Sequence, residues 1–86
     1  MMGYNYADYK DFVLSDKGQR MVFKIRDKAY ELIDKTGCVI AQKIFLSGDV
    51  WESMACVDRL VEMGYLYEVE KPYTTWQHKI FTRDRL

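Results

Sequence analysis

The side chains best suited to catalysis or metal binding are few in this chain and are spread along it. Cys38, Cys56 and His78 are three candidate metal ligands, one fewer than a closed structural zinc site needs, and the cysteines do not form a Cys-x-x-Cys pair. No glycine-rich phosphate loop and no glycine-flanked serine nucleophile occurs. Carboxylate pairs such as Asp58 and Glu62 are spaced as solvated helix faces. We therefore expect no enzyme activity, no metal and no cofactor.

Length and composition favour one folded domain without a membrane segment. Eighty-six residues, 49% of them apolar and 15% aromatic, are enough for one domain with a small core. No apolar run approaches the roughly 18 residues of a transmembrane helix, and the N-terminus lacks the pattern of a secretory signal. Because the two cysteines form no disulfide framework, the cytoplasm is the expected location.

The charge is balanced over the whole chain. Thirteen basic and thirteen acidic residues give a formal net charge of zero. A DNA-binding domain usually carries a positive surplus, because phosphate contacts supply most of its affinity. Residues 71–86 form the only clearly basic region. Balanced charge excludes a strongly basic nucleic-acid binder and leaves room for local charge segregation.

The chain divides into an N-terminal aromatic arm, residues 1–16, and a domain over residues 17–86. Aromatic and apolar side chains at helical spacing over residues 4–14 predict a short helix or helical turn, with Asn5 as its cap.

The domain begins with a long amphipathic helix. Apolar residues recur at steps of one, three and four over residues 17–36. Ser15 is suited to cap its N-terminus and Gly37 to end it in the left-handed conformation. Because Gly18 is a poor helix former, a start at Gln19 is the alternative.

Two further helices follow. Residues 38–40 are apolar but too few to assign, and residues 41–45 predict a second, short helix. A turn then offers Ser47 or Asp49 as the cap of a third helix, which runs to Met63.

A β-hairpin is predicted after the third helix. Gly64 stops that helix, and residues 65–70 alternate with the period of two that is typical of a strand. Residues 71–75 contain a proline and predict a loop, and residues 76–82 are rich in β-branched and aromatic side chains, as a second strand is.

The end of this pattern resembles a known superfamily. Residues 57–66, Val-Asp-Arg-Leu-Val-Glu-Met-Gly-Tyr-Leu, resemble a recognition helix that breaks at glycine into the first wing strand of winged helix-turn-helix proteins, and residues 79–82 resemble the second wing strand. The resemblance covers residues 17–83. It implies an α+β fold: a three-helix bundle with a C-terminal two-stranded wing and a short N-terminal helical arm. This fold hosts DNA readers, RNA readers and protein-binding adaptors, so the function depends on the site.

The first expectation is a small DNA-binding protein, a transcriptional regulator or accessory factor of phage or mobile-element type. In the superfamily the third helix enters the major groove and the wing touches the DNA backbone. Ser53, Cys56 and Arg59 are then offered to the groove, whereas Asp49 and Glu52 have the wrong sign for a phosphate. The other candidate contacts with double-stranded DNA are Arg20, Lys24, Lys28, Gln42, Lys43, Lys71, Thr74, Thr75, Gln77 and Lys79.

The alternative is a winged-helix adaptor that binds a protein partner and no DNA. Thirteen aromatic residues are many for so small a core, and Tyr and Trp are enriched at interface hot spots. The candidate interface residues are Tyr4, Tyr6, Tyr9, Trp51, Tyr73 and Trp76. The three N-terminal tyrosines are equally suited to cover the open side of the helical layer. A homodimer is also expected to be possible, through the N-terminal arm or the first long helix.

Overall fold

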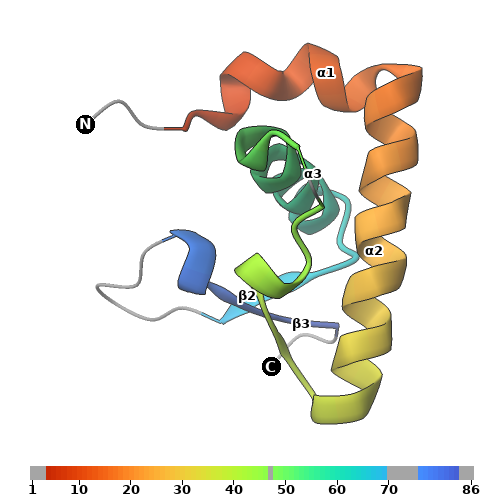
Figure 1. Cartoon of the computed structure of the whole chain (residues 1–86), viewed down its shortest axis with the longest axis vertical. Coiled ribbons are helices and arrows are strands. Elements are labelled where there is room, and N and C mark those ends of the chain that lie inside the picture. The colour runs from red at the N-terminus through yellow and green to blue at the C-terminus, as the bar shows by residue number, and fades with distance from the viewer. Residues whose placement is uncertain (1–3, 47, 70–75, 84–86) are drawn as a thin grey trace.

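The longest helix runs along one side of the molecule (Figure 1). In the computed structural model, which describes residues 4–46, 48–69 and 76–83, helix α2 spans Asp16–Thr36. Ser15 Oγ accepts a hydrogen bond from the backbone N–H of Gly18 at 3.1 Å, and Gly37, with φ of 90°, ends the helix. These two caps confirm the predicted bounds, and the helix begins at Asp16 rather than at Gln19.

Gly18 is required by a close crossing of two helices. The chain enters through the 3₁₀ helix η1, Tyr6–Tyr9, and helix α1, Lys10–Leu14, which turns directly into α2. A Cβ atom on Gly18 would overlap the carbonyl oxygen of Phe12 and lie 2.8 Å from Val13 Cα. Glycine therefore lets α1 pack directly on the first turn of α2.

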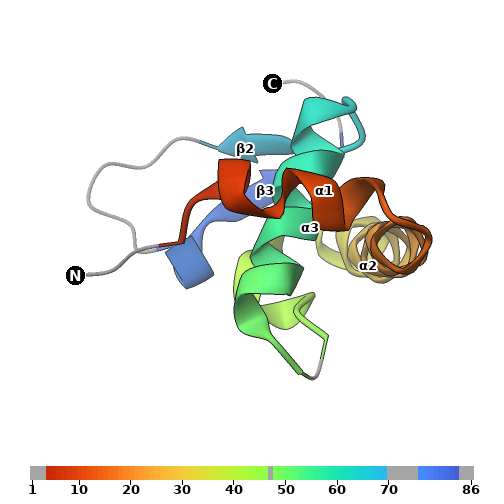
Figure 2. The same ribbon diagram turned by 90° about the horizontal axis from the view of Figure 1, so that it is seen from above.

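Helix α3, Val50–Glu62, lies at the centre of the fold. Asp49 Oδ1 caps it by accepting a hydrogen bond from the N–H of Trp51 at 2.8 Å. Figures 1 and 2 show α1 crossing above α3, α2 running beside it and the sheet lying below it. The helix is thus surrounded by other elements on three sides.

The corner after α3 follows the prediction. Gly64 has φ of 84°, a conformation that costs a glycine little and an L-residue with a side chain much more. The N–H of Tyr65 donates to the carbonyl of Leu60 at 2.9 Å, and the hydroxyl of Tyr30 donates to the carbonyl of Tyr65 at 2.9 Å. The second bond ties the corner to α2 and directs the chain into the sheet.

Within the described residues the sheet has three antiparallel strands, one more than the predicted hairpin. They are β1, Val39–Ile40, β2, Tyr67–Val69, and β3, Ile80–Thr82, in the order β1-β3-β2. The register pairs Val39 with Phe81, Ile40 with Ile80, Tyr67 with Thr82, Glu68 with Phe81 and Val69 with Ile80. The predicted β2–β3 pairing is confirmed, and the apolar residues before the second helix supply the additional strand.

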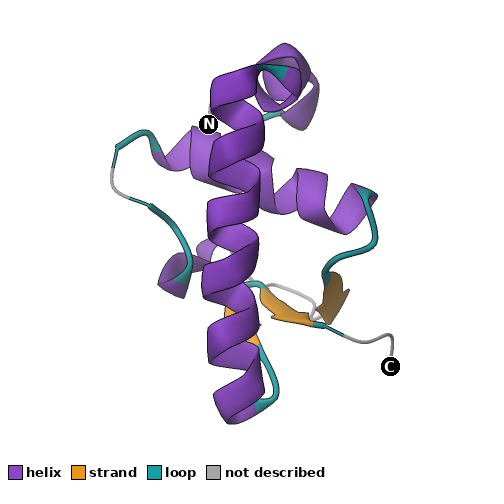
Figure 3. Ribbon diagram, turned by 90° about the vertical axis from the view of Figure 1, so that its right-hand side faces the viewer, coloured by secondary structure: helices purple, strands orange, loops and turns teal. Residues whose placement is uncertain are grey.

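Two predicted elements are shorter than expected (Figure 3). The second helix is a single 3₁₀ turn, η2, Ala41–Lys43. The first half of the predicted second strand is another 3₁₀ turn, η3, Trp76–His78, closed by the N–H of Lys79 bonding to the carbonyl of Trp76 at 3.1 Å. This turn directs Trp76 inward, where its ring packs 6.2 Å from the ring of Phe81. The predicted loop at 71–75 lies outside the described residues.

The buried side chains form one core between α1, α2, α3 and the sheet. Val13, Ile25, Leu60 and Phe81, one from each of these elements, are at most 1% exposed. Among the described residues, the connected core cluster comprises Val13, Val22, Ile25, Ala29, Ile33, Val39, Ala41, Ile44, Ala55, Cys56, Val57, Leu60, Leu66 and Phe81. The structure is therefore a mixed α+β fold with three α-helices and a three-stranded antiparallel sheet in its described part.

Candidate functional site

The face of α3 that points away from the sheet is covered by the chain's own N-terminal segment, residues 4–14 (Figure 2). Tyr4 donates a hydrogen bond from its hydroxyl to Asp58 Oδ2 at 2.5 Å. One turn further along α3, Tyr6 donates to Glu62 Oε1 at 2.8 Å and Lys10 Nζ lies 2.7 Å from Glu62 Oε2. Residues 55, 58 and 62 share one helix face. On that face Ala55 is fully buried, Asp58 is half-buried and Glu62 stays exposed beside its partners, so the N-terminal segment covers most of this face.

Electrostatics favour this contact at neutral pH. Hydrogen bonds from Lys10, Arg59 and Tyr6 lower the pKa of Glu62 to about 2. Burial and the bond to Glu62 raise the pKa of Tyr6 to about 12, so the phenol stays protonated and remains a donor. Burial raises the pKa of Asp58, although the bond from the Tyr4 hydroxyl opposes that shift.

The structure corrects two predicted DNA contacts on α3. Ser53 and Cys56 are fully buried, so the prediction that their side chains face a groove is wrong. Ser53 Oγ accepts the N–H of Leu46 at 3.2 Å and holds the turn before the helix. Burial raises the pKa of the Cys56 thiol to about 12, as expected for a core residue. Arg59 donates to Glu62 Oε1 at 2.7 Å and belongs to the contact with the N-terminal segment.

The remaining DNA candidates outside α2 are scattered. Gln42 and Lys43 are exposed on η2. Lys79 lies 3.5 Å from Glu68 and 4.9 Å from the centre of the Trp76 ring. Lys71, Thr74 and Thr75 lie outside the described residues, and the backbone of Gln77 is part of η3.

Most of the candidate interface aromatics pack inside the molecule. The ring of Tyr4 lies 5.8 Å from that of Tyr9 and 6.0 Å from that of Trp76, and Trp76 lies 5.9 Å from Phe45. These rings are half-buried and join the N-terminal segment to η2 and η3. This agrees with the alternative that the N-terminal tyrosines cover the open side of the helical layer. Tyr6 is held by Glu62, and Tyr73 lies outside the described residues.

Of the interface candidates in the described part of the chain, Trp51 is the most accessible. Its side chain is 39% exposed at the first turn of α3, and the neighbouring Val50 is 48% exposed. The rings of Tyr4 and Trp76 pack on other aromatic rings. No such ring contact is found for Trp51 among the described residues. Two adjacent exposed apolar side chains at a helix tip are suited to contact a partner.

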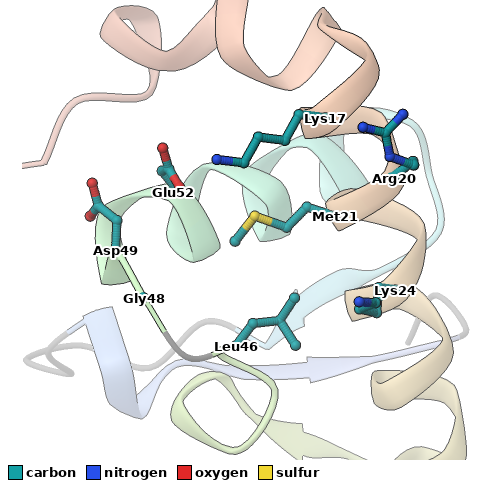
Figure 4. A pocket seen from close by; sticks show the side chains of 8 residues that line it. All are labelled: Lys17, Arg20, Met21, Lys24, Leu46, Gly48, Asp49 and Glu52. Atoms are coloured by element: carbon teal, nitrogen blue, oxygen red, sulfur yellow. The ribbon is translucent and has the colours of Figure 1, made fainter.

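A groove of about 560 Å³ lies beside this tip, between α2 and the turn that leads into α3 (Figure 4). Its α2 wall carries three cations, and its α3 wall carries two carboxylates. Met21 and Leu46 lie between the walls, and Lys17 extends across the groove towards Glu52. The lining residues are Lys17, Arg20, Met21, Lys24, Leu46, Gly48, Asp49 and Glu52.

The sequence did not predict this groove, although four of its lining residues stood out there as possible surface residues. Arg20 and Lys24 were predicted to bind phosphate, and Asp49 and Glu52 were placed outside the core. One signal in the sequence was overlooked. Lys17 stands three residues before Arg20 and seven before Lys24, a spacing that puts all three cations on one flank of α2. That the carboxylates stand opposite these cations depends on how α3 crosses α2, and no local pattern contains that information.

Comparisons of the chain with protein-family models, with curated proteins and with solved structures gave no match. No helix in the described part of the chain is both long and apolar enough to span a bilayer. Within the same residues, no group of three or more His, Cys, Asp and Glu side chains is arranged to hold a metal ion.

Proposed function

We propose that the chain is a winged-helix protein that binds another protein and does not read DNA with its third helix. The order α2, β1, η2, α3, β2, β3, with β3 in the middle of the sheet, supports the winged-helix assignment. In a protein of that superfamily, α3 would be the recognition helix, and β2 and β3 would be the wing strands.

The single observation that carries the proposal is the cover on α3. A helix with its side chains is about 10–12 Å wide, and the major groove is about 12 Å wide, so a recognition helix enters with little space to spare. Here the N-terminal segment is bonded to Asp58 and Glu62 on the outer face of α3. The helix and its cover together are too wide for the groove.

Protein binding is supported by what stays accessible. Trp51 and Val50 are exposed side by side at the tip of α3, and the groove beside them combines apolar and charged side chains of both signs. Interfaces between proteins have this mixed character, whereas a DNA-binding surface is mostly basic.

A second candidate function rests on one flank of α2. Lys17, Arg20 and Lys24 form no ion pair with any described residue, and Lys28 continues their spacing four residues further on. Four cations in a row are suited to dock on a phosphate backbone without entering a groove. Such binding would be insensitive to sequence and steeply dependent on salt.

The first test is a titration of a fluorescently labelled mixed-sequence DNA duplex with the protein at about 50 mM salt, followed by anisotropy. The proposal predicts no binding below about 100 µM protein, the weak end of non-specific affinity. Binding that weakens with a log–log salt slope of about −3 to −4, and that is lost in Lys24→Glu with Lys28→Glu, would favour the second candidate.

The second test asks for the protein partner directly. A photoreactive benzophenone side chain in place of Trp51 is used for cross-linking in the host cell, with the same replacement at the exposed residue Glu31 as the matched control. We expect a protein adduct of defined mass at position 51 that is missing at position 31. Adducts only to nucleic acid, or equal adducts at both positions, contradict the proposal.

A further inference from the structure

The groove beside α3 has walls of opposite charge. Lys17, Arg20 and Lys24 line the α2 side, and Asp49 and Glu52 line the other side. Across the described residues none of these five side chains forms an ion pair, although six other pairs are present. Charges of both signs thus line one groove without a direct ion pair between them.

The groove has an apolar floor, and two exposed apolar side chains lie at the end of α3 beside it. Met21 and Leu46 are half-buried between the walls, and Val50 and Trp51 are exposed at the adjacent tip of α3. Burial of these side chains would supply the favourable free energy of a contact, at about 25 cal/mol per Å² of apolar surface removed from water. The charged walls would fix its orientation.

The charge pattern restricts the class of occupant. An acidic ligand would pair with the α2 wall and be repelled by Asp49 and Glu52, and a basic ligand would meet the reverse problem. The occupant must therefore present one cationic and one anionic edge. In a two-fold symmetric contact a patch faces a copy of itself, so a patch that carries both signs is complementary to itself.

We infer that this groove is an interface between two copies of the chain, with the basic wall of each copy facing the acidic wall of the other. The inference rests on the proposed function, since it names the partner as a second copy. The net charge of zero leaves no long-range repulsion between the copies. The tip of each α3, with Val50 and Trp51, then packs at the groove of the opposite copy.

The inference is tested by a charge exchange between the walls. The acidic variant carries Lys17→Glu and Lys24→Glu, and the basic variant carries Asp49→Asn and Glu52→Lys. Asparagine keeps the helix cap that Asp49 provides. Lys35→Glu, about three turns beyond Lys24 on the same helix, is the control. Circular dichroism checks that each variant is folded.

Sedimentation velocity at protein concentrations up to about 1 mM gives the outcome. We expect the unmodified chain and the control to dimerise, each wall variant alone to associate at least about tenfold more weakly, and the equimolar mixture of the two variants to recover the dimer. A monomeric unmodified chain, a dimer that resists both variants, or a mixture that does not recover would each overturn the inference.

This result is separable from the proposed function. If the chain is monomeric and also fails to bind duplex DNA, the inferred dimer is wrong but the proposed binding of another protein still stands. If the chain dimerises through this groove and binds DNA through α3, the inferred interface is correct but the proposed function is wrong.

Discussion

Replacing Gly18 with alanine tests the packing of α1 on α2, which fixes the N-terminal segment over α3. Helix propensity alone predicts that Gly18→Ala stabilises the protein by about 1 kcal/mol, because the position is inside a helix. The structure predicts the opposite sign. The new Cβ would overlap the carbonyl oxygen of Phe12 and lie 2.7 Å from its carbon, and neither backbone atom can rotate away.

The size of the effect follows from what must move. Relief of the overlap requires α1 to shift away from α2, and Val13, which is fully buried against the core, then loses part of its packing. Full burial of a valine contributes about 1.5–3 kcal/mol, and overpacking in cores costs about 1–3 kcal/mol. After subtraction of the propensity gain, we expect a net loss of about 1–2 kcal/mol in the free energy of unfolding.

Urea denaturation followed by circular dichroism measures that loss. The control is Asp27→Ala, at an exposed position of the same helix, and its free energy of unfolding is expected to lie within about 0.5 kcal/mol of that of the unmodified chain. In a Cys38→Ser background, the rate at which a thiol reagent modifies the buried Cys56 reports opening of the cover over α3, and we expect Gly18→Ala to raise it. If the Gly18→Ala variant is as stable as the unmodified chain, or more stable, α1 does not pack closely on α2 at Gly18.

Three further outcomes follow from the same contacts. Tyr4→Phe leaves the half-buried carboxylate of Asp58 without its donor and should cost about 1 kcal/mol in urea denaturation, whereas the matched Tyr9→Phe should change stability by less than about 0.5 kcal/mol. Ser53→Ala removes the acceptor of the turn before α3 and should cost about 1–2 kcal/mol of stability, with no change in any affinity for DNA. The pKa of Glu62 is lowered from 4.5 to about 2, so its contribution to stability is present above pH 4.5 and is lost as the pH falls towards 2; nuclear magnetic resonance (NMR) shifts of the N-terminal segment should follow that range, and Glu62→Gln should remove the dependence.

The sequence was informative where structure is determined locally. The caps at Ser15 and Gly37, the corner at Gly64 and the pairing of the last two strands each depend on a few neighbouring residues, and each was predicted. A one-turn helix such as η3 gives almost no periodic signal, and the aromatic residues there were read as a strand.

The candidate site was harder to predict because it depends on contacts between distant parts of the chain. The bonds from Tyr4 to Asp58 and from Tyr6 to Glu62 join residues more than 50 positions apart. One signal of the cover was present. Residues 53–57, Ser-Met-Ala-Cys-Val, contain no charged side chain, and a helix that is apolar around its whole circumference is usually buried on all sides. The assignment of Ser53 and Cys56 to an exposed face missed that pattern.

The most direct test of the covered third helix is an NMR titration of the isotope-labelled protein with a mixed-sequence DNA duplex at low salt. We expect contacts between the Tyr4 and Tyr6 rings and the Asp58–Glu62 turn to persist throughout, with no shift changes along α3, Val50–Glu62, as DNA is added. Loss of those contacts together with shift changes concentrated in α3 would show that the N-terminal segment leaves the helix and that α3 binds DNA, contrary to the proposed function.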